Sequence, residues 1–107
     1  MSDERRDSTR LRCAVDIRYA RGHQRIYSGQ ALDISESGAR LVLDEAASSP
    51  TQLTLEFEGK ISLLARTVWA ERMPDGSRQV GVRFEGLHFG QQMALGQYLS
   101  ELITRAA

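Results

Sequence analysis

The first pattern able to do chemistry is an arginine pair, Arg6-x-x-x-Arg10, directly preceded by Arg5. A guanidinium group donates two parallel hydrogen bonds to phosphate oxygens or to the O6/N7 edge of guanine, which an ammonium group does not do. Taken alone the pair is a weak signal, because roughly one or two such pairs arise by chance among so many arginines. The chain contains a second such pair, Arg21-x-x-x-Arg25, which shows how readily the spacing arises in this composition.

The second pattern is Asp33-x-Ser35-x-x-Gly38, which arises by chance in this composition with a probability of roughly 0.04. A carboxylate accepts the paired N–H donors of a guanine edge or of an arginine, and a hydroxyl adds a rotatable donor and acceptor. The glycine would let a ligand approach the backbone. The structural alternative is a turn that Asp33 and Ser35 cap and in which Gly38 takes the left-handed conformation.

The 107-residue chain has an ordinary globular composition but an uneven distribution of charge. Hydrophobic residues make up 41% and charged residues 26%, which indicates one folded domain rather than a disordered chain. The formal net charge is zero, yet residues 1–25 hold seven arginines against four acidic residues, and the rest holds seven basic and ten acidic residues. Long nucleic acids need a broad basic face. We therefore expect a small anionic ligand and no nucleic acid polymer.

Other features exclude common classes of site and predict a cytoplasmic location. The chain has no run of 18 apolar residues and no basic-then-apolar start, so we expect neither membrane insertion nor secretion. The lone Cys13 excludes an internal disulfide and fits a reducing compartment. Together with the distant His23 and His88 it leaves a zinc site without ligands. No nucleophile–base pair or catalytic carboxylate pair is recognisable, so we do not expect an enzyme.

The apolar periodicity divides the chain into an arm and a barrel. Residues 1–10 lack a periodic apolar face, which predicts a flexible arginine-rich arm, whereas residues 11–107 read as one domain. Period-two alternation predicts six strands, and a three-to-four-residue period predicts a helix over about 90–105. Six short strands and one helix favour an all-β, six-stranded antiparallel barrel with the C-terminal helix laid over it. The predicted strands run from Leu11 to Tyr19 and over 26–34, 39–43, 53–58, 61–71 and 80–84.

Two turns are also predicted between these strands. Gly59-Lys60 has the length of a tight hairpin, and a glycine in the first position favours the type II′ form. Pro74 to Ser77 has the composition of a tight turn, with the proline fixing φ and a glycine admitting positive φ.

In combination these segments resemble the PilZ domain family over essentially the whole chain. The arm carries the arginine pair, and the Asp-x-Ser-x-x-Gly motif follows the second of six strands, both without substitution at their defining positions. Two later segments are also similar, and a terminal helix follows them. They are Thr67-Val68-Trp69-Ala70 in the fifth strand and Val80-Gly81-Val82-Arg83-Phe84 in the sixth.

The resemblance implies a receptor for the bacterial second messenger cyclic di-GMP. By that resemblance Arg6 and Arg10 grip the phosphates and guanine edges. An arginine directly before the motif, here Arg5, implies that an intercalated dimer of the nucleotide binds rather than one molecule. Two roles stay open for Trp69, namely an indole that is buried or packed at the rim of the barrel, which its strand position favours, and stacking on a guanine. The motif residues expected to line the barrel beside the nucleotide are Asp33, Ser35 and Gly38.

The functional expectation is a receptor or adaptor whose arm the nucleotide orders onto the barrel, creating a surface that an unidentified downstream protein reads. The alternative is a PilZ-fold module for protein–protein interaction without physiological nucleotide binding. A small RNA-binding barrel is disfavoured, because such barrels need exposed aromatic residues interleaved with basic ones.

Overall fold

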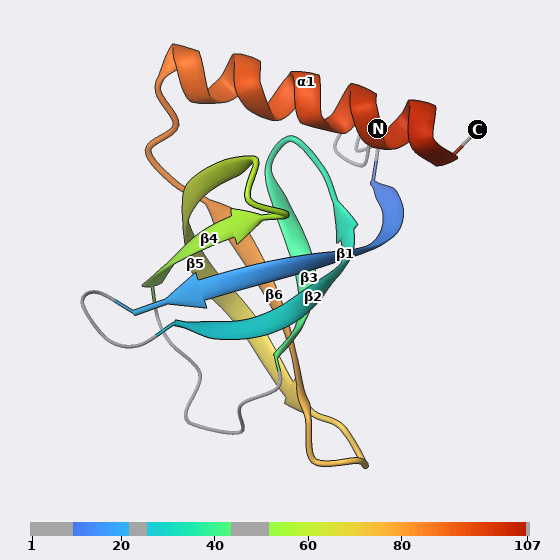
Figure 1. Cartoon of the computed structure of the whole chain (residues 1–107). Helices are drawn as coiled ribbons and strands as arrows, with labels where there is room; N and C mark the ends of the chain where they lie inside the picture. Colours follow the sequence, from blue (N-terminus) through green and yellow to red (C-terminus); the bar gives the residue numbers. More distant parts are fainter. Residues whose placement is uncertain (1–9, 22–25, 44–51, 107) are drawn as a thin grey trace, which may run out of the picture.

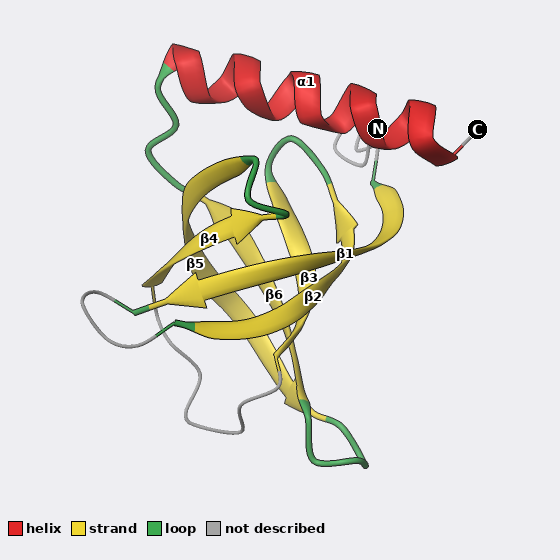
Figure 2. Cartoon of the chain, viewed as in Figure 1, coloured by secondary structure: helices red, strands yellow, loops and turns green. Residues whose placement is uncertain are grey.

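Alternating apolar residues fold this chain into six strands that close into a barrel, with one helix across an end (Figures 1 and 2). The computed structural model describes residues 10–21, 26–43 and 52–106. The elements are β1 (Leu11–Ala20), β2 (Tyr27–Ile34), β3 (Gly38–Leu43), β4 (Gln52–Phe57), β5 (Ile61–Arg72), β6 (Arg78–Phe84) and α1 (Phe89–Ala106).

The strands are antiparallel throughout and follow the order β1-β2-β3-β6-β5-β4 around the barrel. Pairing of β1 with β4 closes the sheet, so no strand is left with an unpaired edge. The β2–β3 loop and the β4–β5 turn lie at the end that α1 covers, and the β5–β6 hairpin extends from the opposite end (Figure 1). The predicted fold class is therefore confirmed.

The core consists of the inward-facing residues of every strand together with one stripe of α1. The alternation is clearest in β4, where Leu53, Leu55 and Phe57 are at most 1% exposed. The Phe57 ring packs edge-on against Phe84, with centroids 6.1 Å apart, and tilted against Tyr98 of α1 at 6.0 Å. Burying each such large side chain contributes about 1.5–3 kcal/mol to folding. From α1 the buried residues are Leu95, Tyr98 and Leu102.

A polar network joins α1 to the β4–β5 turn. The Tyr98 hydroxyl donates to Glu58 Oε1 at 2.7 Å, and Arg105 Nη1 donates to both Glu58 oxygens at 3.0 Å. One turn earlier in the helix, Glu101 forms ion pairs with Lys60 and with Arg105. The helix is therefore held by charge as well as by its apolar stripe.

The same turn corrects the prediction for the β4–β5 hairpin. Its central residues are Glu58 and Gly59 rather than Gly59 and Lys60, and the Lys60 amide donates to the Phe57 carbonyl at 2.8 Å. Both central residues have positive φ, 54° and 72°, which is the type I′ pattern and not type II′. Positive φ is uncommon for a residue other than glycine. Here it accompanies the bonds that the Glu58 carboxylate forms with α1.

Gly38 is required by the packing of β3 against β6. A Cβ atom at Gly38 would lie 2.1 Å from the Val82 carbonyl oxygen, a distance that real Cβ atoms do not adopt. Gly38 does not have positive φ, so the left-handed conformation was the wrong reason for a glycine here, while the predicted approach of a ligand at this position stays a prediction. The close strand contact is the physical reason.

Replacing Gly38 with alanine should lower the free energy of unfolding by about 1–3 kcal/mol, because the strand backbones must move apart. Gly96→Ala is the matched control, since a Cβ at that helical position meets no atom within 4 Å. It should stabilise the chain by about 0.5–1 kcal/mol. Urea unfolding of both variants measures this, and a Gly38→Ala variant as stable as the wild type would contradict the packing argument.

The Glu58 network predicts sensitivity to acid. The Tyr98 hydroxyl, followed by Arg105, holds the pKa of Glu58 below its ordinary value of 4.5, although burial acts in the opposite direction. A folded-state pKa below the unfolded one adds stability above pH 4.5 that disappears as the pH falls through the folded pKa. Glu58→Gln should therefore flatten the loss of stability between pH 6 and pH 3.

Urea unfolding across that pH range tests the effect. Tyr98→Phe removes the principal hydrogen bond and should cost about 1–2 kcal/mol at pH 7, discounted for partial exposure of the carboxylate. Identical acid profiles for the wild type and Glu58→Gln would show that the network does not anchor the helix.

Candidate functional site

A buried carboxylate joins the two motifs found in the sequence. Asp33, at the end of β2, is 5% exposed and is the only buried charged residue in the described part of the chain. Its Oδ1 accepts a hydrogen bond from Arg10 Nη1 at 2.8 Å, and its Oδ2 accepts one from Arg40 Nε at 3.0 Å. Arg10 directly precedes β1 and belongs to the arginine pair, whereas Arg40 lies on β3. The structure thus brings the first motif onto the second.

Strand register explains how these three residues meet. Asp33 is paired directly with Arg40 across β2 and β3. The pairing shifts register between Ala31 and Asp33, and the consecutive residues Asp33 and Ile34 are both buried. The loop between β2 and β3 is short, so a residue just after it on β3 returns beside the end of β2. The carboxylate therefore points to the same face as the Arg40 guanidinium.

The electrostatics of this cluster favour a bound anion. A carboxylate with 7% of its side chain exposed is costly unless it is paired, and two guanidinium groups provide that pairing. The Arg10 and Arg40 side chains are themselves 54% and 38% exposed. A guanidinium has five N–H donors, and each arginine uses one of them on Asp33. Donors therefore remain available to a ligand from solvent.

Ser35 organises the loop that follows Asp33. Its hydroxyl oxygen accepts hydrogen bonds from the amides of Ser37 and Gly38, both at 3.2 Å, and the Ser35 amide donates to the Gly38 carbonyl at 2.8 Å. With these bonds Ser35 caps the turn, as the structural alternative in the sequence analysis predicted for this residue. Ser35 and Gly38 thus fix the loop and strand that present Asp33.

Trp69 lies on the outside of the barrel in the same row of residues as the cluster. Arg40 of β3 is paired with Gly81 of β6, which is paired with Trp69 of β5. The indole lies across Gly81, where an added Cβ would be 2.1 Å from the indole nitrogen, and Trp69 remains 42% exposed. The side chain is therefore not buried, and its exposed indole lies over β6 at Gly81, the residue paired with Arg40.

Sequence reasoning leaves Arg40 out of the site, although its side chain could reach a ligand. An arginine on a strand is usually solvated, and nothing in either motif includes this position. The available signal was its place two residues after Gly38, where a short antiparallel connection returns the chain beside Asp33. Arg5 and Arg6 lie outside the described residues, so their predicted roles stay predictions.

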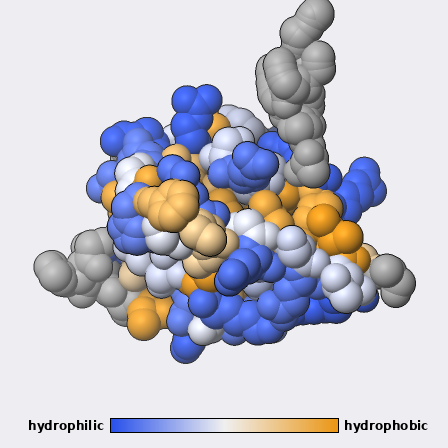
Figure 3. Space-filling model, turned by 90° about the horizontal axis from the view of Figure 1, so that it is seen from above, coloured by the Kyte–Doolittle hydropathy of each residue, from blue (hydrophilic) through white to orange (hydrophobic). Residues whose placement is uncertain are grey.

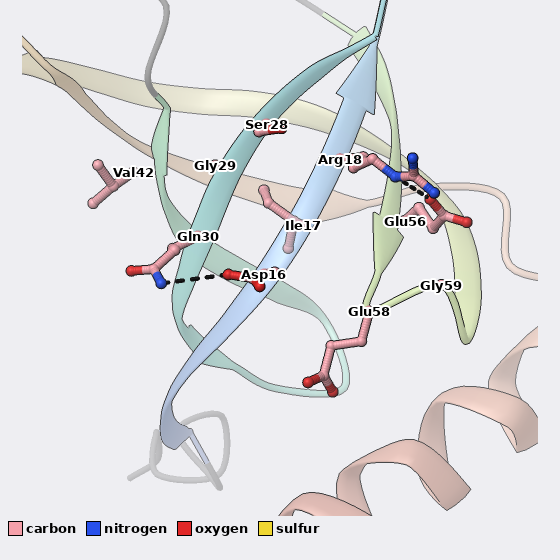
Figure 4. A pocket seen from close by; sticks show the side chains of 10 residues that line it. All are labelled: Asp16, Ile17, Arg18, Ser28, Gly29, Gln30, Val42, Glu56, Glu58 and Gly59. Carbon is pink, nitrogen blue, oxygen red and sulfur yellow. Dashed lines mark hydrogen bonds and ion pairs between the residues drawn. The ribbon is translucent and has the colours of Figure 1, made fainter.

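A hollow in the barrel wall lies elsewhere (Figure 4). It has a volume of about 660 Å³, and its acidic lining includes Asp16, Glu56 and Glu58. Arg18 forms an ion pair with Glu56 at 3.0 Å across it. With three carboxylates against one arginine, this hollow is not suited to an anion.

A second groove borders the arginine cluster and runs along α1. It encloses about 650 Å³, and Leu11 and Glu36, the neighbours of Arg10 and Ser35, form part of its wall. Seen from above, apolar side chains are exposed among hydrophilic ones at this end of the molecule (Figure 3). On α1, Phe89 and Ile103 are 74% and 52% exposed. The groove is thus an apolar surface next to the candidate site.

The described residues contain neither a metal-binding cluster nor a membrane-spanning helix. No group of three or more His, Cys, Asp or Glu side chains is arranged to hold a metal ion there. No described helix is long and apolar enough to cross a membrane.

Comparison with known proteins is consistent with this geometry. Among solved structures, the Bacillus subtilis inhibitor of motility MotI/DgrA is similar to this chain, with a TM-score of 0.74 and 18% sequence identity. The match covers 98% of this chain and 54% of the MotI/DgrA chain. The K. pneumonia MrkH–c-di-GMP complex has a TM-score of 0.74 at 19% identity, covering 97% and 55%. This chain therefore spans about half the length of these two proteins.

The PilZ domain of CeSA from a cellulose-synthesizing bacterium has a TM-score of 0.69 at 21% identity, covering 89% of this chain and 98% of its own. Among curated proteins, no sequence matches. The family model described as the PilZ domain matches residues 4–101. With that match over most of its length, and with the barrel and helix in place, the chain belongs to the PilZ domain family.

Proposed function

We propose that this chain is a receptor for cyclic di-GMP that acts as an adaptor, with the nucleotide drawing the arginine arm onto the barrel. The observation that carries the proposal is the bond between Arg10 and Asp33, which joins the two motifs across 23 residues of sequence. Membership of the PilZ domain family and the fold shared with MrkH, which was solved as a c-di-GMP complex, support it further.

In this proposal the charges of the cluster match those of a cyclic dinucleotide. Arg6 and Arg10 donate to phosphate oxygens and to the O6/N7 edges of guanine. The Asp33 carboxylate accepts from the guanine N–H edge, and Trp69 offers a face on which a base stacks. Arg5 contributes to a second, intercalated nucleotide.

The energetics require several arginines to act together. Holding residues 5–9 in one conformation costs about 5–10 kcal/mol of backbone entropy relative to a free chain. Each charge-assisted hydrogen bond contributes about 1.5–3 kcal/mol to binding. One arginine is therefore insufficient to offset the entropy cost, whereas three arginines with paired contacts are enough. The pre-placed Arg10 shortens the segment that binding has to fix.

In this proposal a partner protein reads the state of the site. The groove along α1 adjoins the arm at Leu11 and the motif loop at Glu36, so a change in the arm alters the edge of an exposed apolar surface. A downstream protein that reads this combined surface would respond to the nucleotide. The same groove favours a second candidate, a PilZ-fold interaction module that binds its partner without nucleotide, and the titration below separates the two.

Titration of the full chain with cyclic di-GMP in a calorimeter should show binding that Arg6→Ala and Arg10→Ala each weaken about 100-fold or more, because each variant removes paired charge-assisted bonds. Arg18→Ala is the matched control, since Arg18 pairs with Glu56 on another part of the barrel. Cyclic di-AMP and GTP test base and ring specificity. Wild-type affinity in both arm variants would refute the proposal, and no binding by the wild type would favour the interaction module.

The same titration gives the stoichiometry. We expect two nucleotides per chain for the wild type and one for Arg5→Ala, because the extra guanidinium holds the second molecule of the intercalated pair. A ratio of one in both proteins would rule out the dimer while leaving the receptor proposal intact.

A further inference from the structure

The two oxygens of the Asp33 carboxylate are held by arginines from different segments of the chain. Arg10 Nη1 is on Oδ1 at 2.8 Å and Arg40 Nε is on Oδ2 at 3.0 Å. Arg12, on β1, is also paired in register with Asp33, but no hydrogen bond or ion pair joins them in the described part of the chain. The carboxylate is therefore shared between two guanidinium groups.

This sharing limits how Arg10 can pair with Asp33. An isolated arginine and carboxylate favour a fork-to-fork geometry, in which two parallel N–H groups occupy both oxygens. In the structure Arg40 Nε holds Oδ2 while Arg10 makes a single bond, on Oδ1, so Arg10 and Asp33 do not adopt the fork-to-fork geometry. Among the described residues the Arg10 guanidinium engages one of its five donors, on Asp33, and its side chain is 54% exposed, so a ligand from solvent can reach the others.

We propose that Arg40 is a positioning residue for the nucleotide site. By holding Asp33 Oδ2 it keeps the carboxylate in the orientation in which Arg10 reaches Oδ1 alone, and so leaves the remaining donors of Arg10 available for a phosphate. Arg40 acts through Asp33 rather than on the nucleotide itself. The inference rests on the proposed function, but its first step concerns the protein without ligand.

The ligand-free step is tested by double-mutant cycles in urea unfolding. Arg10→Gln, Asp33→Asn and the double variant give the coupling between Arg10 and Asp33, first in the wild type and then in Arg40→Gln. Without Arg40 the pair gains a second charge-assisted bond, so the coupling should grow about tenfold as an equilibrium constant. Arg12→Gln is the control: it removes a neighbouring positive charge but no bond to Asp33, and should leave the coupling within about twofold. Unchanged coupling in Arg40→Gln would overturn the proposal.

The ligand step is tested by titrating cyclic di-GMP into the same proteins. Arg40→Gln should weaken binding about tenfold with unchanged stoichiometry, because Arg10 must first give up a bond to Asp33. Arg40→Lys retains a donor for Oδ2 and should keep both coupling and affinity within about threefold of the wild type. Weaker binding without a change in coupling would make Arg40 a direct contact and contradict the positioning role.

Two further outcomes are also decisive. In Arg40→Gln, stronger coupling between Arg10 and Asp33 with unchanged affinity would show that the nucleotide does not need the donors of Arg10 that the second bond engages. That result contradicts the ligand step. If the wild type binds no cyclic di-GMP, the proposed function fails, and the coupling alone decides whether Arg40 restrains Arg10. Arg40→Met, which keeps an apolar stem of comparable length, replaces Arg40→Gln should that variant fail to fold.

Discussion

A carboxylate almost completely removed from water needs a cation, and the functional end of this molecule is built on that requirement. Asp33 satisfies it twice, with Arg10 from the N-terminal segment and Arg40 from β3. One ionised group thereby ties the start of β1 to the β2–β3 loop and leaves two half-exposed guanidinium groups at the surface. The same contact that stabilises the fold concentrates positive charge where an anion can reach it.

The rest of the barrel supports this cluster without taking part in it. Closure through β1 and β4 fixes the strand positions, and the contact of Gly38 with Val82 sets how closely β3 approaches β6. At the same end, the Glu58 network holds α1 over the core and shapes the groove beside the motif loop. The apolar groove is therefore adjacent to the candidate site.

The fold could be predicted from the sequence because the alternation of apolar and polar residues is a strong signal for strands. Leu53, Leu55 and Phe57 illustrate it, since all three are buried in the structure. Asp33 and Ser35 could be picked out because they belong to one motif with a fixed spacing, and their roles toward a ligand stay predictions. The type of the β4–β5 turn was not predicted correctly. There Glu58 has a positive φ and bonds to Tyr98 of α1, which lies forty residues later in the chain. Sequence reasoning left out Arg40 and misjudged Gly38 for the same reason, since both depend on contacts between strands that local sequence does not encode.

The central claim is that the arginine arm and the Asp33 cluster form one site for a cyclic dinucleotide. A crystal structure of the full chain with cyclic di-GMP tests it most directly. The account predicts phosphates within hydrogen-bond distance of the Arg6 and Arg10 guanidinium groups and a guanine edge at Asp33. A nucleotide bound in the acidic hollow of Figure 4, or away from both motifs, would contradict it.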